Sequence, residues 1–390
     1  MEKTDCALIL GSYVNGYSIV RELHEKKVEN IVLFDSTRNI ASYSNKITQH
    51  VSIEDTPENL LNALNKLHEE YEKIIVFPTS DLHLENLHKI HKAIEGYCFL
   101  PFNPENLIEC SDKYHQYSWC EKLGVPYPKT IRIENIKDID RILSIQFPVL
   151  LKPVRRDDLK IDVFRNLQLK DREEFDKNKR KIEDFIRKGI PFIASEIIPG
   201  DGSNIYAYVG YRNKQGVIVN EWTGKKLSQF PNDFGVFASA SNQAPDTVYH
   251  QGRTLLNGMN LMGIAEPEFK YDYRDGKYKL MEINLRSMMW HRVGNLSGVY
   301  LQYSQYLDAL GKIADKQSQI KDKDIHLFYF KHELFNVLFR RKYAGIFYKN
   351  LFRSDKTHFA VFCPDDLLPW IVDTKNAILR VIKREFKEYT

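Results

Sequence analysis

Three side chains with metal-binding oxygens lie on two stretches that have the pattern of β-strands. Residues 281–284 alternate apolar and polar types, so the strand period of two places Glu282 and Asn284 on one face. Glu268 lies on an earlier stretch of the same kind, and Asp275-Gly276 between the two stretches is typical of a turn. The sequence therefore predicts a hairpin that brings Glu268, Glu282 and Asn284 together.

This set of oxygens suits one kind of metal ion. Mg²⁺ is usually held by one or two carboxylates together with nucleotide phosphates, and it keeps some of its water. Arg286 follows directly and could neutralise negative charge that develops on a transferred phosphoryl group. The alternative is that Glu268 and Glu282 belong to solvated faces of an ordinary hairpin, because exposed carboxylates are common.

The first hundred residues alternate short apolar runs with amphipathic stretches. Short apolar runs that alternate with helical patterns indicate a parallel sheet with helices on both faces. The predicted strands are 7–10, 31–34 and 74–77, and the predicted helices are 17–27, a segment capped by Thr56 with Pro57 at its first position, and 82–94. We therefore expect an N-terminal parallel α/β domain.

Ligands of parallel sheets bind beyond the carboxyl ends of the strands. The residues expected there are Gly11, Ser12, Asn15, Asp35, Thr79, Ser80 and Asp81. A nicotinamide cofactor would use the turn GSYVNG, but this turn lacks the full G-x-G-x-x-G pattern. Structural turn glycines and a strand-end aspartate are the alternative, and a nicotinamide oxidoreductase remains a rival hypothesis.

The middle of the chain places two lysines next to predicted elements. Ser111-Asp112-Lys113 opens a helix that runs to about Leu123, where glycine and two prolines follow. Residues 147–151 form an apolar strand that delivers Lys152 at its end, and residues 192–198 form another, broken by Pro199-Gly200. Because Lys152 stands between an apolar strand and a proline, its stem should be fixed while its ammonium reaches a pocket.

Several strings occur in the order typical of one superfamily. They are DK at Asp112, LGVPYPKT from Leu123, FPVLLKP from Phe147, SEIIPG from Ser195 and MEINLR from Met281. Together they resemble the carboxylate-amine ligases of the ATP-grasp superfamily. LILGSYVNGYSIVRELHE from Leu8 and TGKKLSQFPNDFG from Thr223 further resemble D-aspartate ligases and predicted ATP-dependent carboligases. The resemblance covers most of the chain and weakens after about residue 311.

The resemblance implies a role for each matching residue. It implies an N-terminal parallel α/β domain over residues 1–110, an ATP-grasp α+β domain over 111–311 and a helical C-terminal extension over 312–390. It implies ATP with two Mg²⁺ ions, which are held by Glu268, Glu282 and Asn284. It further implies that Lys113 and Lys152 contact the phosphates, that the backbone of Glu196, Ile197 and Ile198 contacts adenine, and that Asp201 contacts the ribose. Substrate or phosphate is implied at Lys225, Lys226 and Gln229.

The implied reaction has two steps. A carboxylate attacks the γ-phosphate of ATP, and an amine, expected to be an amino acid, displaces phosphate from the acyl phosphate; a cell-envelope precursor is the suggested carboxylate. Positioning and charge neutralisation supply most of the rate of phosphoryl transfer, so no nucleophilic serine or cysteine is needed. Arg292 could grip a carboxylate in a bidentate contact, and His291 could move protons, although packing against its apolar neighbours is the alternative.

One departure from the superfamily pattern opens another alternative. Relatives carry a glycine-rich phosphate loop after the matching lysine, whereas this chain reads Val154-Arg155-Arg156. Arg155 or Arg156 could replace the loop by charge-assisted contact, or they could form an exposed basic turn. A nucleotide-binding module without catalysis therefore remains a further hypothesis.

Composition narrows the classes of protein to which the chain can belong. The 390 residues are 43% hydrophobic and carry a formal charge of +4, which disfavours a wholesale nucleic-acid or membrane binder, so any basic patch must be local. Five scattered cysteines and a start without a secretory pattern predict a cytoplasmic protein. Residues 377–386 form an amphipathic helix with Ile378, Val381, Ile382 and Phe386 on one side, which is expected to pack on the body or to rest on anionic lipid as a peripheral membrane contact.

Overall fold

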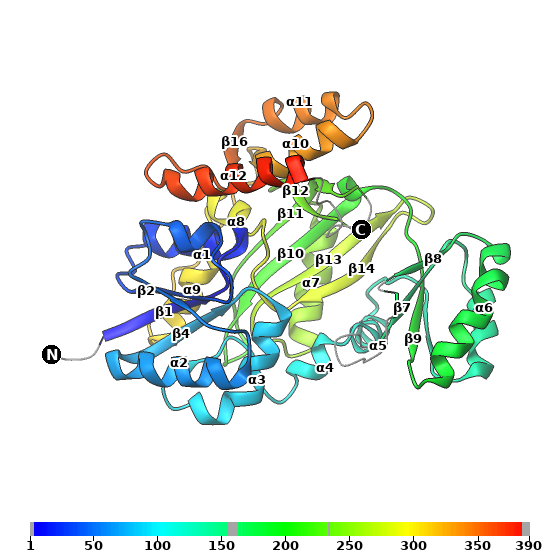
Figure 1. Cartoon of the computed structure of the whole chain (residues 1–390), viewed down its shortest axis with the longest axis horizontal. Helices are drawn as coiled ribbons and strands as arrows, with labels where there is room; N and C mark the ends of the chain where they lie inside the picture. Colours follow the sequence, from blue (N-terminus) through cyan, green and yellow to red (C-terminus); the bar gives the residue numbers. More distant parts are fainter. Residues whose placement is uncertain (1–3, 155–162, 165, 233–234, 384–390) are drawn as a thin grey trace.

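The computed structural model describes residues 4–154, 163–164, 166–232 and 235–383. Arg155 and Arg156, for which a phosphate contact and an exposed basic turn are the two alternatives, lie outside the described residues. Within the described part, the strands form a five-stranded, a four-stranded and a seven-stranded sheet (Figure 1). The fold is therefore mixed α/β, as the sequence predicts.

The N-terminal sheet is parallel, with strand order β3-β2-β1-β4-β5. Its elements are β1 (Thr4–Leu10), α1 (Val14–Glu25), β2 (Ile31–Asp35), the 3₁₀ helix η1 (Ile40–Tyr43), β3 (Gln49–Ser52), α2 (Pro57–Glu70), β4 (Tyr71–Pro78), α3 (Asp81–Ile94) and β5 (Cys98–Phe99). Thr56 caps α2 through the Asn59 amide, and Pro57 occupies its first position, because a missing N–H costs nothing there. The predicted alternation is confirmed, with β3 added at one edge and β5 at the other.

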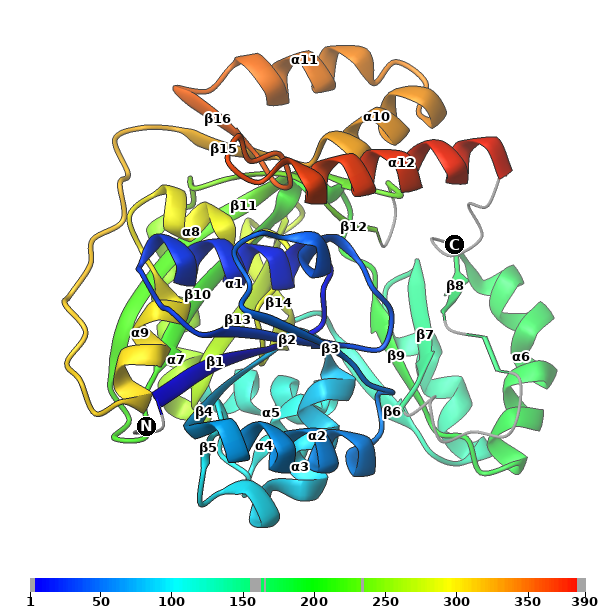
Figure 2. The ribbon, with the colours of Figure 1, turned by 60° about the vertical axis from the view of Figure 1, so that its left-hand side comes forward.

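A smaller antiparallel sheet, ordered β6-β9-β7-β8, forms a lobe beside the main body (Figure 2). Its segment contains α4 (Leu107–Ser111), α5 (Lys113–Leu123), β6 (Thr130–Ile133), η2 (Ile136–Ser144), β7 (Val149–Pro153), β8 (Leu167–Leu169), α6 (Arg172–Arg187), β9 (Phe192–Glu196) and η3 (Gly202–Asn204). Helix α6 turns Phe175, Ile182 and Ile186 onto this sheet and exposes its charged side. The lobe thus has a core of its own.

The seven-stranded sheet, ordered β14-β13-β10-β11-β12-β15-β16, forms the centre of the molecule. Its first part contains β10 (Ile205–Arg212), β11 (Ile218–Phe230), β12 (Val236–Ser241), α7 (Asp246–Gly258), β13 (Gly263–Asp272), β14 (Lys277–Asn284), α8 (Arg292–Leu296) and α9 (Leu301–Ala309). The turn between β13 and β14 includes Gly276, whose φ of +70° favours glycine. The predicted hairpin is therefore present.

The C-terminal segment contains helices and strands. Its elements are β15 (Ile325–Phe328), α10 (Phe330–Phe339), α11 (Ala344–Phe352), β16 (Lys356–Phe359) and α12 (Leu367–Lys383). The expected helices are present, but β15 also pairs with β12 and β16 with β15. The domain boundary predicted at residue 311 therefore separates strands that belong to one continuous sheet. In the described part of the chain, no helix combines the length and apolarity needed to cross a bilayer.

Helix α12 differs from the favoured prediction. It begins at Leu367, ten residues before the predicted start. Ile378 and Val381, which were expected to pack on the body, are 55% and 37% exposed. The periodicity correctly indicated an apolar stripe but did not reveal which way the stripe faces. Of the other two predicted members, Phe386 lies outside the described residues, and the side chain of Ile382 is not described either.

Candidate active site

The β13–β14 hairpin gathers four oxygen-bearing side chains. Glu268 lies directly opposite Glu282, and Glu266 lies directly opposite Asn284. Directly opposite residues of an antiparallel pair share a face, and so do residues two apart on one strand. The three predicted metal ligands therefore share one face, together with Glu266, which the prediction missed.

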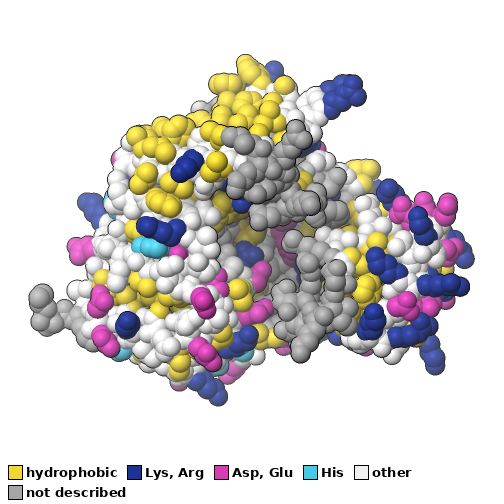
Figure 3. Space-filling model, viewed as in Figure 1, with side chains coloured by type: hydrophobic (Ala, Val, Ile, Leu, Met, Phe, Trp, Pro, Cys, Tyr) yellow, Lys and Arg dark blue, Asp and Glu magenta, His cyan; other side chains and the backbone are white. Residues whose placement is uncertain are grey.

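Two lysines from other elements bind the carboxylates of this hairpin. The Lys113 ammonium of α5 lies 2.5 Å from a Glu282 oxygen, and the Lys226 ammonium of β11 lies 2.5 Å from a Glu268 oxygen. Lys226 and Glu268 are both buried, whereas about a third of the Lys113 and Glu282 side chains is exposed. Figure 3 shows the molecular surface hollowed between the main body and the lobe of α6, with acidic and basic side chains inside the hollow.

The charges of these groups are strongly coupled. The positive charge of Lys113, aided by Lys152 and Lys226, lowers the pKa of Glu282 to about 2. Burial raises the pKa of Glu268, and the neighbouring carboxylates of Glu282 and Glu266 raise it further against the effect of Lys226. Lys152 at the end of β7 thus acts electrostatically on the same carboxylate as Lys113. The site brings both predicted phosphate-binding lysines toward the hairpin.

Helix α5 is held along β14 by hydrogen bonds that fix Lys113. The Asp112 carboxylate caps the helix by accepting from the His115 amide at 2.8 Å. The Gln116 side chain accepts from the Ile283 amide and donates to its carbonyl, and Tyr117 donates to the Met281 carbonyl at 2.9 Å. Because α5 contacts the strand backbone itself, Lys113 is set against Glu282.

The residues predicted at adenine lie at the end of β9. The amide of Glu196 donates to Lys129, and the amide of Ile197 donates to Pro148. The Ile198 amide donates to no described residue, so within this part of the chain it is the one of the three amides that remains available for a ligand. The adenine contact of Ile198 stays a prediction.

The side chains around Glu196 form an ionic cluster. Glu196 binds Arg274 at 3.0 Å and Lys279 at 3.1 Å, and both cations also bind Asp272. Hydrogen bonds from Arg274 and Lys279 hold the pKa of Asp272 well below its usual range. Asp201, predicted at the ribose, caps η3 by accepting from Ser203. The cluster fixes the end of β9 against the β13–β14 hairpin.

Arg286 connects the N-terminal sheet with the hairpin. Its guanidinium donates two hydrogen bonds to Asp81, at 2.7 and 2.9 Å, where α3 begins at the carboxyl end of β4. This bidentate contact fixes the plane of the guanidinium. Glu266 and Glu282 also contribute to a raised pKa of Arg286, although burial opposes them. Arg286 therefore carries its charge beside the carboxylates.

Other predicted strand-end residues bond to one another. Asn15 donates to the Thr79 carbonyl at 2.8 Å, and Thr79 donates to the Leu10 carbonyl at 2.6 Å. Asp35 accepts from Ser42 and contacts His50 at 3.0 Å. These contacts favour the structural interpretation of the turn over a nicotinamide site.

His291 and Arg292 have structural partners. His291 is buried, contacts Glu266 through Nε2 and lies among Trp222 and Trp290. Arg292 donates two hydrogen bonds to Glu25 on α1. The expectation that Arg292 grips a substrate carboxylate is corrected by this contact, because its guanidinium already binds a carboxylate of the protein.

A metal site of protein ligands alone is not formed in the described residues. No three His, Cys, Asp or Glu side chains there are placed to hold an ion. Two carboxylates and one amide do fit Mg²⁺ that takes its remaining ligands from phosphates and water. The hairpin would then hold the ion through Glu268, Glu282 and Asn284.

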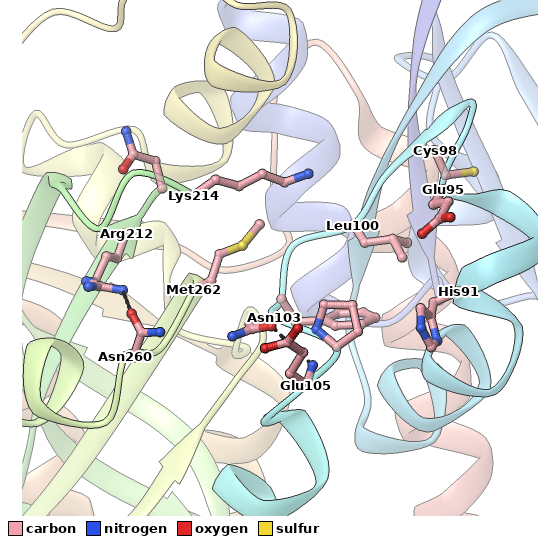
Figure 4. A pocket seen from close by; sticks show the side chains of 13 residues that line it. His91, Glu95, Cys98, Leu100, Asn103, Glu105, Arg212, Lys214, Asn260 and Met262 are labelled. Carbon is pink, nitrogen blue, oxygen red and sulfur yellow. Dashed lines mark hydrogen bonds between the residues drawn. The ribbon is translucent and has the colours of Figure 1, made fainter.

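A separate cavity of about 410 Å³ lies away from this hairpin (Figure 4). Arg212 and Asn260, which share a hydrogen bond, line one wall, and His91, Glu95 and Cys98 line the other. None of the predicted site residues lines this cavity. It therefore plays no part in the candidate site.

Comparisons with known proteins place these features in context. No protein-family model matches the chain. The D-aspartate ligase of Enterococcus faecium (strain Aus0004) is 27% identical over 300 residues, which span 72% of this chain and 70% of that protein.

Two solved structures share the architecture. The ADP complex of N5-carboxyaminoimidazole ribonucleotide synthetase has a TM-score of 0.62 at 13% identity, and the match covers 87% of this chain and 85% of the other. The biotin carboxylase domain of the Hydrogenobacter thermophilus 2-oxoglutarate carboxylase, solved with MgADP and bicarbonate, also has a TM-score of 0.62, at 16% identity over 81% of this chain and 72% of the other. At these identities the likeness establishes a shared fold.

Proposed function

The chain has the ATP-grasp fold and resembles a D-aspartate ligase in sequence, and we propose that it joins a carboxylate to an amine in an ATP- and Mg²⁺-dependent, ADP-forming reaction. One observation carries this proposal. Two opposed carboxylates, Glu268 and Glu282, are each paired with a lysine from another element. When ligands bind, the carboxylates of such a site can exchange their lysine partners for a metal ion, and the lysines can exchange their carboxylate partners for a polyphosphate.

In this proposal, different groups of the protein bind different parts of the nucleotide. Glu268, Glu282 and Asn284 would hold Mg²⁺, as two ions, and the metal would supply neutralisation of the phosphate charge. Lys113 leaves Glu282 for the phosphate oxygens, and Lys152, whose positive charge also acts on Glu282, binds phosphate with it. The Ile198 amide binds the adenine edge, and Asp201 binds the ribose. Positioning by these groups lowers the barrier without a covalent enzyme intermediate.

Arg286 and Lys226 act where the reacting atoms meet. Arg286, held in plane by Asp81, stabilises negative charge on the transferred phosphoryl group. Lys226 neutralises the buried Glu268 until substrate arrives and then contacts substrate or phosphate. The carboxylate substrate becomes an acyl phosphate, and the amine then attacks its carbonyl carbon and releases phosphate.

The similarity to a D-aspartate ligase supports an amino acid as the amine. A cell-envelope precursor as the carboxylate substrate, and a cytoplasmic location, remain predictions from the sequence. A panel of free amino acids and small carboxylates would narrow both substrate classes.

Product formation tests the proposal. The protein is incubated with ATP, Mg²⁺ and pairs of amino acids and carboxylates, and ADP and phosphate are measured. ADP release that requires both substrates supports the ligase. ATP binding with no turnover under any pair, including cell-envelope precursors, would contradict it and favour a nucleotide-binding module.

A further inference from the structure

Exposed apolar side chains are concentrated at the C-terminal end of the described chain. Of the twenty-four large hydrophobic side chains that are exposed in the described residues, fourteen lie between Phe330 and Val381. This segment, here called the C-terminal lobe, contains α10, α11 and α12, which lie together at one end of the molecule (Figure 2). Figure 3 shows hydrophobic side chains gathered over the same region. A concentration of this size marks an interaction surface.

In an ordinary surface helix the large apolar side chains face the protein, whereas in α12 they face solvent. Its buried positions are Pro369, Asp373 and Ala377, spaced four residues apart. Large apolar side chains point outward instead, including Ile371 at 50% and Ile378 at 55% exposure. A shallow groove of about 340 Å³ runs along this outer side, lined by Trp370, Ile371, Thr374, Lys375, Ile378 and Leu379.

Polar contacts hold α12 on the rest of the molecule. Asp373 accepts from Lys331 at 2.6 Å and from Tyr329 at 3.0 Å. Asp366, just before α12, accepts from Tyr17 at 3.0 Å and from Ser44 at 2.5 Å. The inner side of α12 is thus fixed by buried carboxylates, so the outer apolar side is not needed to attach the helix.

The charged residues that the C-terminal lobe exposes are mostly basic. The Lys and Arg side chains of the lobe that reach solvent are Arg340, Arg341, Lys342, Lys349, Arg353, Lys356, Lys375 and Arg380. Among the described residues from Phe330 to Val381, only two acidic side chains, Asp355 and Asp365, are exposed. Asp365 is paired with Lys46 at 2.6 Å. The exposed charge of the lobe is therefore strongly positive.

We propose that the outer face of the C-terminal lobe docks on an anionic lipid bilayer, with α12 lying in the membrane interface. Apolar side chains on one side of a helix, flanked by Lys and Arg, are the features that bind such a surface. A second copy of the same face is disfavoured, because a two-fold interface would bring the eight basic residues of each copy together. Binding to lipid does not depend on the proposed ligase chemistry.

Vesicle flotation tests the proposal on the full chain. The protein should float with phosphatidylcholine vesicles that contain phosphatidylglycerol and stay unbound with pure phosphatidylcholine. Ile371→Glu/Ile378→Glu should reduce flotation by at least about tenfold, because both apolar contacts are replaced by charge. Arg341→Glu/Arg353→Glu should reduce it by a similar factor through lost attraction to anionic lipid. All four positions are exposed, so each variant should keep the circular dichroism spectrum of the wild type.

Matched controls separate docking from a general effect of charge. Ile313→Glu changes a 96% exposed apolar residue outside the lobe. Lys177→Glu/Lys188→Glu reverses two exposed charges, one on α6 and one at its C-cap. Both variants should float like the wild type. Trp370 emission should shift to shorter wavelength on docking, and Trp370→Phe should remove that shift. Equal flotation of the Ile371→Glu/Ile378→Glu variant and the wild type would overturn the proposal. So would a dimer in sedimentation velocity that this variant dissociates, because the face would then bind a second copy.

Discussion

Glu282 lies directly opposite Glu268 across the β13–β14 hairpin, and each carboxylate is paired with a lysine from a different element. Lys113 comes from α5 and Lys226 from β11, so three parts of the chain meet at two carboxylates. Like charges directly opposite each other destabilise a hairpin unless cations offset them. The lysines thus stabilise the hairpin before ligand binds, and they remain available to bind phosphate.

Lys113 should govern nucleotide affinity. In Lys113→Met, the affinity for a non-hydrolysable ATP analogue with Mg²⁺ should fall by about 10- to 100-fold, because a charge-assisted phosphate contact is lost. Calorimetric titration measures this directly. Lys122→Met on the same helix is the control and should bind normally, because Lys122 contacts Trp119. Unchanged affinity in Lys113→Met would refute the phosphate contact.

Lys226 should stabilise the ligand-free fold. Lys226→Met leaves the buried Glu268 without its cation, so the free energy of unfolding should fall by about 3 kcal/mol in urea titrations without Mg²⁺. Adding Glu268→Gln to this variant should restore part of the loss, because the unpaired charge is removed. If the single and double variants unfold at the same urea concentration, the pair has no such role.

Arg286 should need its bidentate contact with Asp81 in order to support full kcat. Arg286→Lys keeps the charge but loses the bidentate geometry, so kcat should fall by about 10²-fold with a smaller change in the KM for ATP. Asp81→Asn should lower kcat less, because it weakens positioning while the guanidinium remains. Steady-state kinetics of both variants test this order, and a larger loss in Asp81→Asn would reverse the assigned roles.

His332 should make the stability of the C-terminal lobe depend on pH. Burial, aided by the positive charge of Lys331, lowers the pKa of His332 to about 3. Between about pH 6.5 and pH 3 the unfolded chain therefore binds the extra proton, and the free energy of unfolding falls as the pH falls. By pH 5 this loss should be about 2 kcal/mol.

The variant His332→Asn isolates this effect. The Asn amide can still donate to the Phe237 carbonyl, which His332 Nδ1 contacts at 2.7 Å, but it does not titrate. Denaturant titrations at pH 7.5 and pH 5 should therefore show a smaller difference for the variant than for the wild type. An identical pH difference would mean that other groups cause it.

The local pattern of the sequence predicted the hairpin and the helix at Lys113. Alternation over residues 281–284 indicated which residues share a face, and Asp112 with Gly124 marked both ends of α5, where Gly124 has a φ of +69°. Glu266 was missed, although it stands two residues before Glu268 on the same strand. Glu266 is buried and contacts His291, a partner 25 residues away that no local pattern indicates.

Contacts between distant segments account for the other misses. Ser239 of β12 pairs with Phe328 of β15, and no local pattern identifies such a partner. The stripe of α12 showed the apolar side of the helix but not its direction, which the buried contacts of Asp373 determine. The lysine partners of Glu268 and Glu282 likewise come from elements that only the tertiary fold brings together.

The effect of Mg²⁺ on nucleotide binding tests the central claim most directly. Affinity for a non-hydrolysable ATP analogue is measured by calorimetry with and without Mg²⁺ in the wild type and in Glu282→Ala, with circular dichroism to show that the variant is folded. We expect Mg²⁺ to raise the affinity of the wild type by at least about tenfold and to have little effect on Glu282→Ala, whose turnover should also be abolished. An undiminished Mg²⁺ effect with full activity in Glu282→Ala would contradict the account.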